Sequence, residues 1–127
     1  MNQHNGQTLA YLGDACFELA IRDYLLARGW TKVNDLHRQA VRYTSAMGQA
    51  LAMARLLETE LNETEIAVFK RGRNAEATRK PKNVTLSTYH QATGFEALLG
   101  HLYLEKNHGR LEEIIAFAIR AIEENPD

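Results

Sequence analysis

The chain has 127 residues, of which 45% are hydrophobic and 24% are charged, and its net charge is −1. This length fits a single domain over residues 1–127 with a core of its own, and no apolar run reaches the roughly 18 residues that suggest a membrane span. A net charge near zero excludes a general nucleic-acid binder, so any nucleic-acid surface must be a local one.

The first sixteen residues indicate whether the protein is secreted and whether it forms disulfides. Residues 1–7 are polar, lack the apolar core of a signal peptide, and are predicted to form an N-terminal tail. The single cysteine, Cys16, cannot form an internal disulfide, and its apolar neighbours predict a buried and unreactive thiol. We therefore expect a cytoplasmic protein that does not associate with membranes.

Helical patterns cover nearly the whole chain, and no strand of useful length is predicted. The expected helices span residues 8–28, 34–43, 45–58, 62 into the basic segment, 87–106 and 110–123. Gly29 is placed to end the first helix, and Asn62 with Glu65 forms a capping-box pattern at the start of the fourth. The first helix is apolar around most of its circumference, which is typical of a central helix. The fold class is all-α.

The first candidate functional residue is Asp14, which lies early in this most apolar helix. A carboxylate at the head of an apolar stripe is poorly solvated unless a cation meets it. Gly13 costs about 0.5–1 kcal/mol in a helix interior relative to alanine, and its presence suggests that another backbone or a ligand approaches closely. The alternative is an ordinary surface carboxylate near a helix start, where the helix dipole favours it.

The second candidate is Glu96, at the edge of the apolar stripe of the fifth helix. Gly100 follows one turn later and is expected to leave space beside the carboxylate. A partly exposed helical glutamate without a function is the alternative. Two carboxylates from separate helices would suit Mg²⁺, which prefers oxygen ligands and retains several waters. None of the five histidines forms a zinc-binding pattern with a second histidine or a cysteine.

The third feature is a basic segment over residues 70–82, which contains six basic residues and one acidic residue. It also contains glycine, proline and small polar residues, so a mobile basic loop is predicted over about residues 74–84. Backbone phosphates are the natural ligand for such a segment. The alternative is a solvated loop without a function.

Together these motifs resemble the ribonuclease III family. The resemblance is carried by Tyr-Leu-Gly-Asp-Ala at 11–15, Asn-Asp-Leu-His at 34–37, Arg-Gly-Arg-Asn-Ala at 71–75 and Phe-Glu-Ala-Leu-Leu-Gly at 95–100. It spans residues 8–122 and is greatest for the branch called Mini-ribonuclease III, which lacks the double-stranded-RNA-binding domain. Each motif alone is weakly specific, whereas their order and spacing together are strongly specific.

The resemblance implies an all-α, homodimeric endonuclease that cuts double-stranded RNA and leaves 5′-phosphate ends. By residue-by-residue transfer, Asp14 and Glu96 are the catalytic carboxylates and bind Mg²⁺, for which Mn²⁺ can substitute. The expected substrate is the precursor of 23S ribosomal RNA, with ribosomal protein L3 as a helper. The residues expected to bind RNA are Lys70, Arg71, Arg73, Asn74, Arg79, Lys80 and Lys82.

The sequence departs from the wider family at two positions. The larger enzymes carry a glutamate where this chain has Ala10 and an aspartate where it has Thr93, so Glu18 is an untested substitute ligand. Two rival readings remain: a non-catalytic ribonuclease III-like RNA-binding scaffold, and a helical adaptor without an RNA role. Trp30 and Tyr103 are expected in the core or at an interface.

Overall fold

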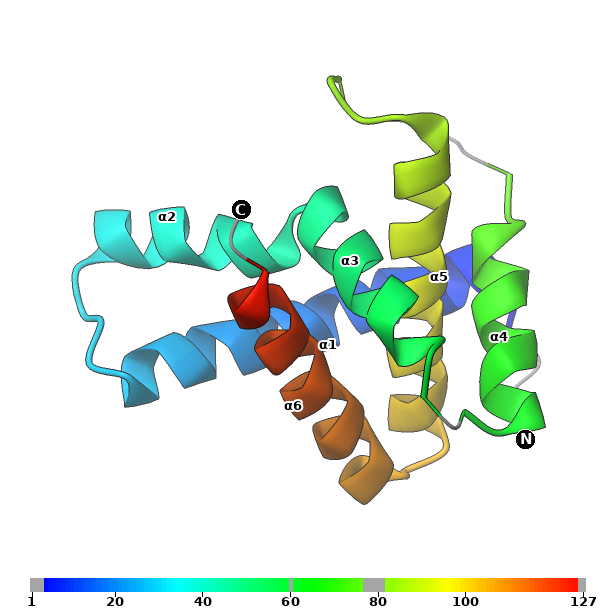
Figure 1. Cartoon of the computed structure of the whole chain (residues 1–127). Coiled ribbons are helices and arrows are strands. Elements are labelled where there is room, and N and C mark those ends of the chain that lie inside the picture. Colours follow the sequence, from blue (N-terminus) through cyan, green and yellow to red (C-terminus); the bar gives the residue numbers. More distant parts are fainter. Residues whose placement is uncertain (1–3, 60, 77–81, 126–127) are drawn as a thin grey trace.

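The computed structural model describes residues 4–59, 61–76 and 82–125. In this part of the chain all regular structure is helical, as the sequence predicted, and no strand is present. Figure 1 shows the elements in chain order: α1 (Gly6–Ala27), α2 (Val33–Thr44), α3 (Ala46–Leu56), α4 (Glu63–Arg73), α5 (Leu86–Leu104) and α6 (His108–Glu124).

The helix starts follow from side-chain caps, which satisfy backbone N–H groups that have no partner within the helix. The predicted capping box of α4 is confirmed, because Asn62 and Glu65 each accept a hydrogen bond from the other's backbone N–H. The prediction for α1 was wrong by two residues. Asn5 caps this helix, which therefore begins at Gly6, inside the predicted tail of residues 1–7. Likewise α2 begins at Val33, one residue before its predicted start at residue 34.

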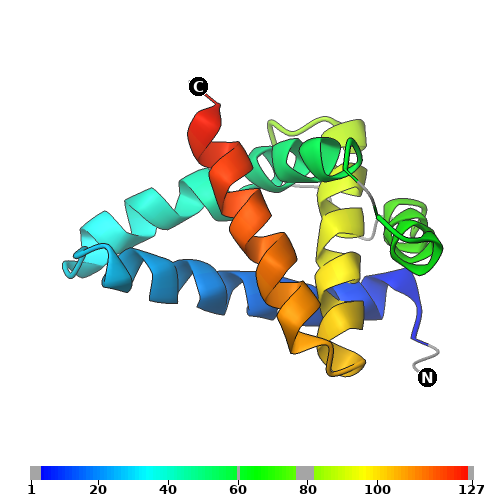
Figure 2. The ribbon, with the colours of Figure 1, turned by 60° about the horizontal axis from the view of Figure 1, so that its bottom comes forward.

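Helix α5 is the centre of the molecule and contacts α1, α3, α4 and α6. Figure 2 shows α1 crossing α5, α4 lying beside α5 near the N-terminus, and α3 and α6 on the other side. The start of α4 is tied to the start of α6 by a buried ion pair. Arg110 donates two hydrogen bonds, of 2.7 and 2.9 Å, to the two oxygens of Glu65.

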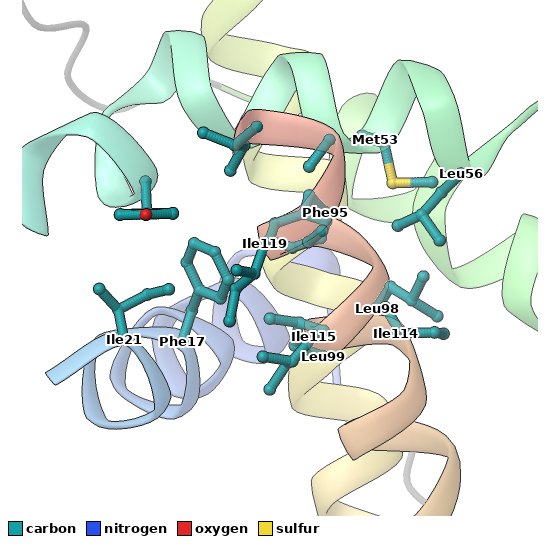
Figure 3. Close-up of a cluster of buried hydrophobic side chains, with 14 of the residues drawn as sticks. Phe17, Ile21, Met53, Leu56, Phe95, Leu98, Leu99, Ile114, Ile115 and Ile119 are labelled. Carbon is teal, nitrogen blue, oxygen red and sulfur yellow. The ribbon is translucent and has the colours of Figure 1, made fainter. Parts of the chain in front are cut away.

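The main core fills the space between α1, α3, α5 and α6. Its largest members point toward one another in Figure 3, and each is less than one-tenth exposed. Phe17 of α1 and Phe95 of α5 meet edge to face with ring centroids 5.1 Å apart, an arrangement that aromatic pairs prefer. The labelled core residues are Phe17, Ile21, Met53, Leu56, Phe95, Leu98, Leu99, Ile114, Ile115 and Ile119.

The crossing of α1 and α5 brings the two backbones into direct contact. A Cβ atom added to Gly13 would lie 1.7 Å from the carbonyl oxygen of Glu96, and one added to Gly100 would lie 2.0 Å from that of Leu9. The close approach predicted at Gly13 is therefore confirmed. The sequence suggested that Gly100 leaves space beside the Glu96 carboxylate. This was wrong, because the backbone of α1 occupies that space.

One apolar side of α1 does not enter the core, and the predicted burial of Cys16 is only partial. Leu12 and Cys16 are only half-buried and Leu19 is 71% exposed, so this side of the helix faces outward rather than into the core. Burial still raises the pKa of the Cys16 thiol, which keeps it protonated and unreactive. Trp30 and Tyr103 also lie outside the core, with 37% and 45% of their surfaces exposed.

The crossing makes a direct prediction about stability. Gly13→Ala should lower the free energy of unfolding by about 2–4 kcal/mol, because the added methyl group meets backbone atoms that cannot rotate away. Urea denaturation measures the change.

Gly109→Ala is the matched control, since nothing lies within 4 Å of the added Cβ and the residue lies in α6. Here we expect a gain of up to about 1 kcal/mol from helix propensity. Equal stability of Gly13→Ala and the wild type would refute the contact at the crossing.

Candidate active site

An open hollow of about 360 Å³ lies where α1, α5 and the end of α4 come together. Helix α1 contributes the residues of its first three turns, and α5 contributes residues from its first half. The segment that follows α4 contributes the remaining part of the rim. The lining residues are Gln7, Ala10, Tyr11, Asp14, Ala75, Glu76, Tyr89, Thr93 and Glu96.

Asp14 and Glu96 meet in this hollow, as the sequence predicted for the pair. Both residues lie at the α1–α5 crossing. Asp14 directly follows Gly13, and the backbone carbonyl of Glu96 contacts Gly13. Asp14 is exposed to solvent, whereas Glu96 is half-buried. The two carboxyl groups are therefore held together by the backbones of two helices rather than by flexible loops.

The electrostatics of the pair follow from this arrangement. Removal from water raises the pKa of Glu96 to about 9, and the hydrogen bond and charge of Asp14 act in the same direction. Two carboxylates in contact cannot both be charged at low cost, so without a cation Glu96 keeps its proton until about pH 9. A hydrogen bond from Gln49 opposes these effects and lowers the pKa of Glu96.

The donor set fits a hard divalent cation. Both ligands are carboxylate oxygens, and the open hollow leaves room for waters and a substrate phosphate, which Mg²⁺ normally retains among its ligands. In the described ranges 4–59, 61–76 and 82–125, no group of three or more His, Cys, Asp or Glu side chains could hold a metal. Asp14 and Glu96 would therefore supply the protein's share of the coordination shell.

The two positions at which larger enzymes of the family carry acidic residues also line the hollow. Ala10 is buried and has no polar group to offer. The hydroxyl of Thr93 donates to the carbonyl of Tyr89 at 2.9 Å, within its own helix. Neither residue can add a carboxylate to the pair formed by Asp14 and Glu96.

Glu18 is not brought into the hollow. Its carboxylate accepts a hydrogen bond from Arg22 at 3.3 Å, and it lines a separate depression between α1 and α2. The structure therefore gives the predicted substitute ligand another partner.

The predicted RNA-binding residues surround the hollow only in part. Lys70, Arg71 and Arg73 form the last turns of α4, directly before Ala75 and Glu76 on the rim. The guanidinium of Arg73 lies 5.5 Å from the centre of the Phe69 ring.

Lys70, Arg71, Asn74 and Lys82 are exposed, and Arg73 is half-buried. The Nε–H of Arg73 donates to the Asn74 side chain at 3.1 Å. Arg79 and Lys80 lie outside the described residues, as does much of the predicted loop of residues 74–84.

Five residues of the site were missed from the sequence. Gln7 and Tyr11 lie seven and three positions before Asp14, and Tyr89 lies seven before Glu96, so helical periodicity could have placed all three on the same faces. Glu76 follows a helix end and Gln49 belongs to a third helix. No spacing in the sequence links either of them to the pair.

Comparison with known proteins gives concordant results. The model of the Ribonuclease III domain family matches residues 7–107. A protein from Enterococcus faecalis named Mini-ribonuclease 3 is 49% identical over 96% of this chain and 93% of its own length. One of the same name from Symbiobacterium thermophilum is 47% identical over 91% of this chain and 88% of its own length. A crystal structure of a Fusobacterium nucleatum protein superposes with a TM-score of 0.83 at 31% identity, covering 94% of each chain.

The fold and the paired carboxylates therefore define a ribonuclease III-type endoribonuclease, a class of enzymes that generally depends on divalent metal ions. More narrowly, the chain belongs to the Mini-ribonuclease 3 branch of the ribonuclease III family. No helix in the described part of the chain is long and apolar enough to cross a membrane.

The raised pKa of Glu96 predicts how stability depends on pH in the metal-free protein. The unfolded chain loses this proton near the ordinary value of 4.5, whereas the folded chain keeps it until about pH 9. Between these two values the folded state binds one proton more than the unfolded state. The contribution of this proton to the free energy of unfolding is complete below pH 4.5 and is lost as the pH rises toward 9. Glu96→Gln cannot ionise and escapes this loss.

In chelator at pH 8 we therefore expect Glu96→Gln to melt about 5 °C or more above the wild type, with a gap that shrinks toward pH 5. Glu58→Gln, at an exposed carboxylate, should match the wild type at both values. Thermal denaturation across this range measures both. A gap for Glu96→Gln that does not change with pH would contradict the raised pKa of Glu96.

Proposed function

We propose that this enzyme cuts double-stranded RNA at a site where Asp14 and Glu96 hold Mg²⁺, with Mn²⁺ able to take its place. The observation that supports this most is the meeting of the Asp14 and Glu96 carboxyl groups, from two helices, in one open hollow. A divalent cation placed between them would permit Glu96 to ionise. When bound, the ion acts as a Lewis acid toward the scissile phosphodiester.

The chain's own residues have separate tasks in this proposal. Asp14 and Glu96 hold the cation, and their backbones at the α1–α5 crossing keep the two carboxyl groups in register. Tyr11 is 83% exposed at the rim and is placed to meet the substrate beside the reacting phosphate. The rim carries no cationic side chain among the described residues, so the substrate's other phosphates must be bound next to it.

The basic segment supplies those contacts. Lys70, Arg71, Arg73 and Asn74 lie at the end of α4, immediately before the rim, and Lys82 lies on the far side of the connection to α5. Arg79 and Lys80 join them by sequence. Duplex RNA is bound mainly through its phosphates, 2′-hydroxyls and shape, and this segment provides donors for the phosphates.

The enzyme acts as a homodimer in this proposal, because one chain has one pair of carboxylates and duplex cleavage needs a cut in each strand. An apolar depression of about 670 Å³ lies between α1 and α6, on a different face of α1 from Asp14. Leu19 and Tyr103 line it and are 71% and 45% exposed. A second copy that covered this face would bury both side chains and place a second active site in the assembly.

The substrate in the cell is the paired end of the 23S ribosomal RNA precursor, in the cytoplasm, and ribosomal protein L3 assists by presenting it. This assignment rests on the Mini-ribonuclease III resemblance.

The cleavage assay tests the catalytic assignment. With labelled duplex RNA and Mg²⁺, the wild type should produce cuts with 5′-phosphate ends, and chelator should abolish them. Asp14→Asn and Glu96→Gln should each lower the rate roughly 10³-fold or more, because each removes half of the cation's protein ligands. Glu58→Gln should cut at the wild-type rate.

Two outcomes would count against the assignment. Full activity of either carboxylate variant would remove that residue from the site. Wild-type protein that binds both a generic duplex and a ribosomal precursor stem but cuts neither would favour the non-catalytic scaffold.

The dimer is tested by Leu19→Glu, which puts a charge on the apolar face. We expect the wild type to sediment as a dimer and Leu19→Glu as a monomer that retains its helical content and loses paired cuts. Met47→Glu on α3 is the matched control, since Met47 is also 71% exposed, and it should remain dimeric. A wild type that stays monomeric at high concentration would refute the dimer.

A further inference from the structure

Arg73, the last residue of α4, differs from the other described cations of the basic segment because its side chain is held on two sides. Its guanidinium lies 5.5 Å from the centre of the Phe69 ring, one turn earlier on the helix. Its Nε–H donates to the side-chain oxygen of Asn74 at 3.1 Å. The other cations have exposed side chains without a hydrogen bond to any described residue: Lys70, Arg71 and Lys82. Arg73 therefore has the least side-chain freedom to lose when it binds a ligand.

The ring beneath this guanidinium is itself fixed against α5. Phe69 is 1% exposed, and a Cβ atom added to Gly94 would lie 2.6 Å from its ring. The next turn of α4 is equally close, since a Cβ atom added to Gly72 would lie 3.0 Å from the Cα of Gly94. Glu96 lies two positions beyond Gly94 on the same helix. The position of Arg73 relative to Glu96 is therefore set by close contacts between the two helices.

The first turn of α1 holds the end of α4 as well. A Cβ atom added to Gly6 would lie 2.4 Å from the carbonyl oxygen of Arg71. The side-chain amide of Gln7 donates to the carbonyl of Glu76, and both of these residues lie on the rim of the hollow. The backbone is thus anchored to α1 on both sides of Arg73, so its guanidinium is preorganised beside the rim.

The free edge of this guanidinium fits a phosphodiester. A guanidinium has five N–H donors in one plane, and Asn74 takes only the one on Nε. The four donors on the two Nη atoms bind no other described residue, and a parallel pair of them matches two oxygens of one phosphate. Arg73 lies two positions before Ala75, which is on the rim. A phosphate on this edge would lie beside the hollow and not within it.

We propose that Arg73 binds one backbone phosphate beside the scissile one and so sets the register in which the duplex lies on the enzyme, with Phe69 and Asn74 as positioning residues. The proposal rests on duplex RNA as the substrate. The exposed cations of the segment then attract the polyanion, whereas Arg73 determines which phosphate reaches the carboxylate pair. Phosphate contacts of fixed geometry position a protein along a duplex without reading its sequence.

The test measures binding of a labelled duplex RNA in chelator and maps the cuts made in Mg²⁺. Arg73→Lys keeps the charge but loses the planar fork, so we expect roughly tenfold weaker binding with an unchanged dependence on salt. Arg73→Met also loses the charge, so the slope of log affinity against log salt should fall by about one. In both variants the cuts should spread to neighbouring phosphates, while Mn²⁺ affinity without RNA stays that of the wild type.

Arg120→Lys is the matched control, because the guanidinium of Arg120 also lies over a phenylalanine ring, 6.0 Å from the centre of Phe117. Arg120 is exposed on α6, which contributes no residue to the lining of the hollow. This variant should bind and cut the duplex like the wild type. Either wild-type affinity or wild-type cut positions in Arg73→Lys would overturn the proposal.

A double-mutant cycle tests the part given to Asn74. Asn74→Ala removes the oxygen that holds the Nε–H of Arg73 and changes no charge, so it should weaken binding several-fold on its own. In the Arg73→Met background it should change affinity by less than about twofold, because no guanidinium is left to position. A loss of the same size in both backgrounds would mean that Asn74 contacts the RNA itself, and would overturn its positioning role.

The role of Arg73 can fail separately from the proposed function. A wild type that binds no duplex RNA, in Ca²⁺ or in chelator, would refute the proposed substrate and the role of Arg73 with it. If the wild type binds, and joint replacement of Lys70 and Arg71 by Gln flattens the salt slope while Arg73→Met leaves it unchanged, only the role of Arg73 fails.

Discussion

The contact between the backbones of α1 and α5 is the constraint on which the active site depends. Gly13 and Gly100 permit an approach that a single methyl group on either would prevent. Since Asp14 is the next residue after Gly13, and Glu96 supplies the carbonyl that Gly13 meets, the spacing of the two carboxyl groups is set by the main chain. Main-chain contacts between helices are far less adjustable than side-chain rotamers, so the pair is preorganised before any cation arrives.

The same contact explains why the site is unstable without a ligand. Phe17 and Phe95, which follow Asp14 and precede Glu96 along their helices, pack edge to face in the core. Desolvation and the neighbouring Asp14 then make ionisation of Glu96 costly. A site built to bind a dication must bring negative charges together. The folding of the rest of the chain has to offset that cost, and the bound cation later removes it.

The positions of the helices could be predicted from local features of the sequence. Cap residues and apolar spacing located all six helices to within about two residues, and the capping box at Asn62 was read correctly. The pairing of Asp14 with Glu96 was proposed from the preference of Mg²⁺ for carboxylate ligands, and the family resemblance then assigned both as catalytic residues. Spacing could not supply it, because nothing local links residues 82 positions apart. Gly13 gave the only physical indication of a close approach, because a glycine inside a helix is destabilising unless another group must pack against it.

The failures have a common cause. A helix that is apolar on all sides does not reveal which side is covered. The sequence therefore did not indicate that the side of α1 with Leu12, Cys16 and Leu19 faces outward, and Cys16 was expected to be buried. Burial of Gln49 depends on how α3 packs against α5, which no local pattern encodes. Glu18 was considered as a ligand because it lies on the stripe of Asp14, and the nearby Arg22 determined its partner instead.

Because α1 uses several of its sides at once, few substitutions in its sequence can be tolerated. One side of this helix enters the core through Phe17 and Ile21, another carries Asp14, and a third forms the exposed apolar face around Leu19. Gly13 is excluded from change by the crossing. Few positions in the first four turns are therefore free to accept a random substitution. One of the motifs that carry the family resemblance, Tyr-Leu-Gly-Asp-Ala at 11–15, lies on this constrained part of the helix.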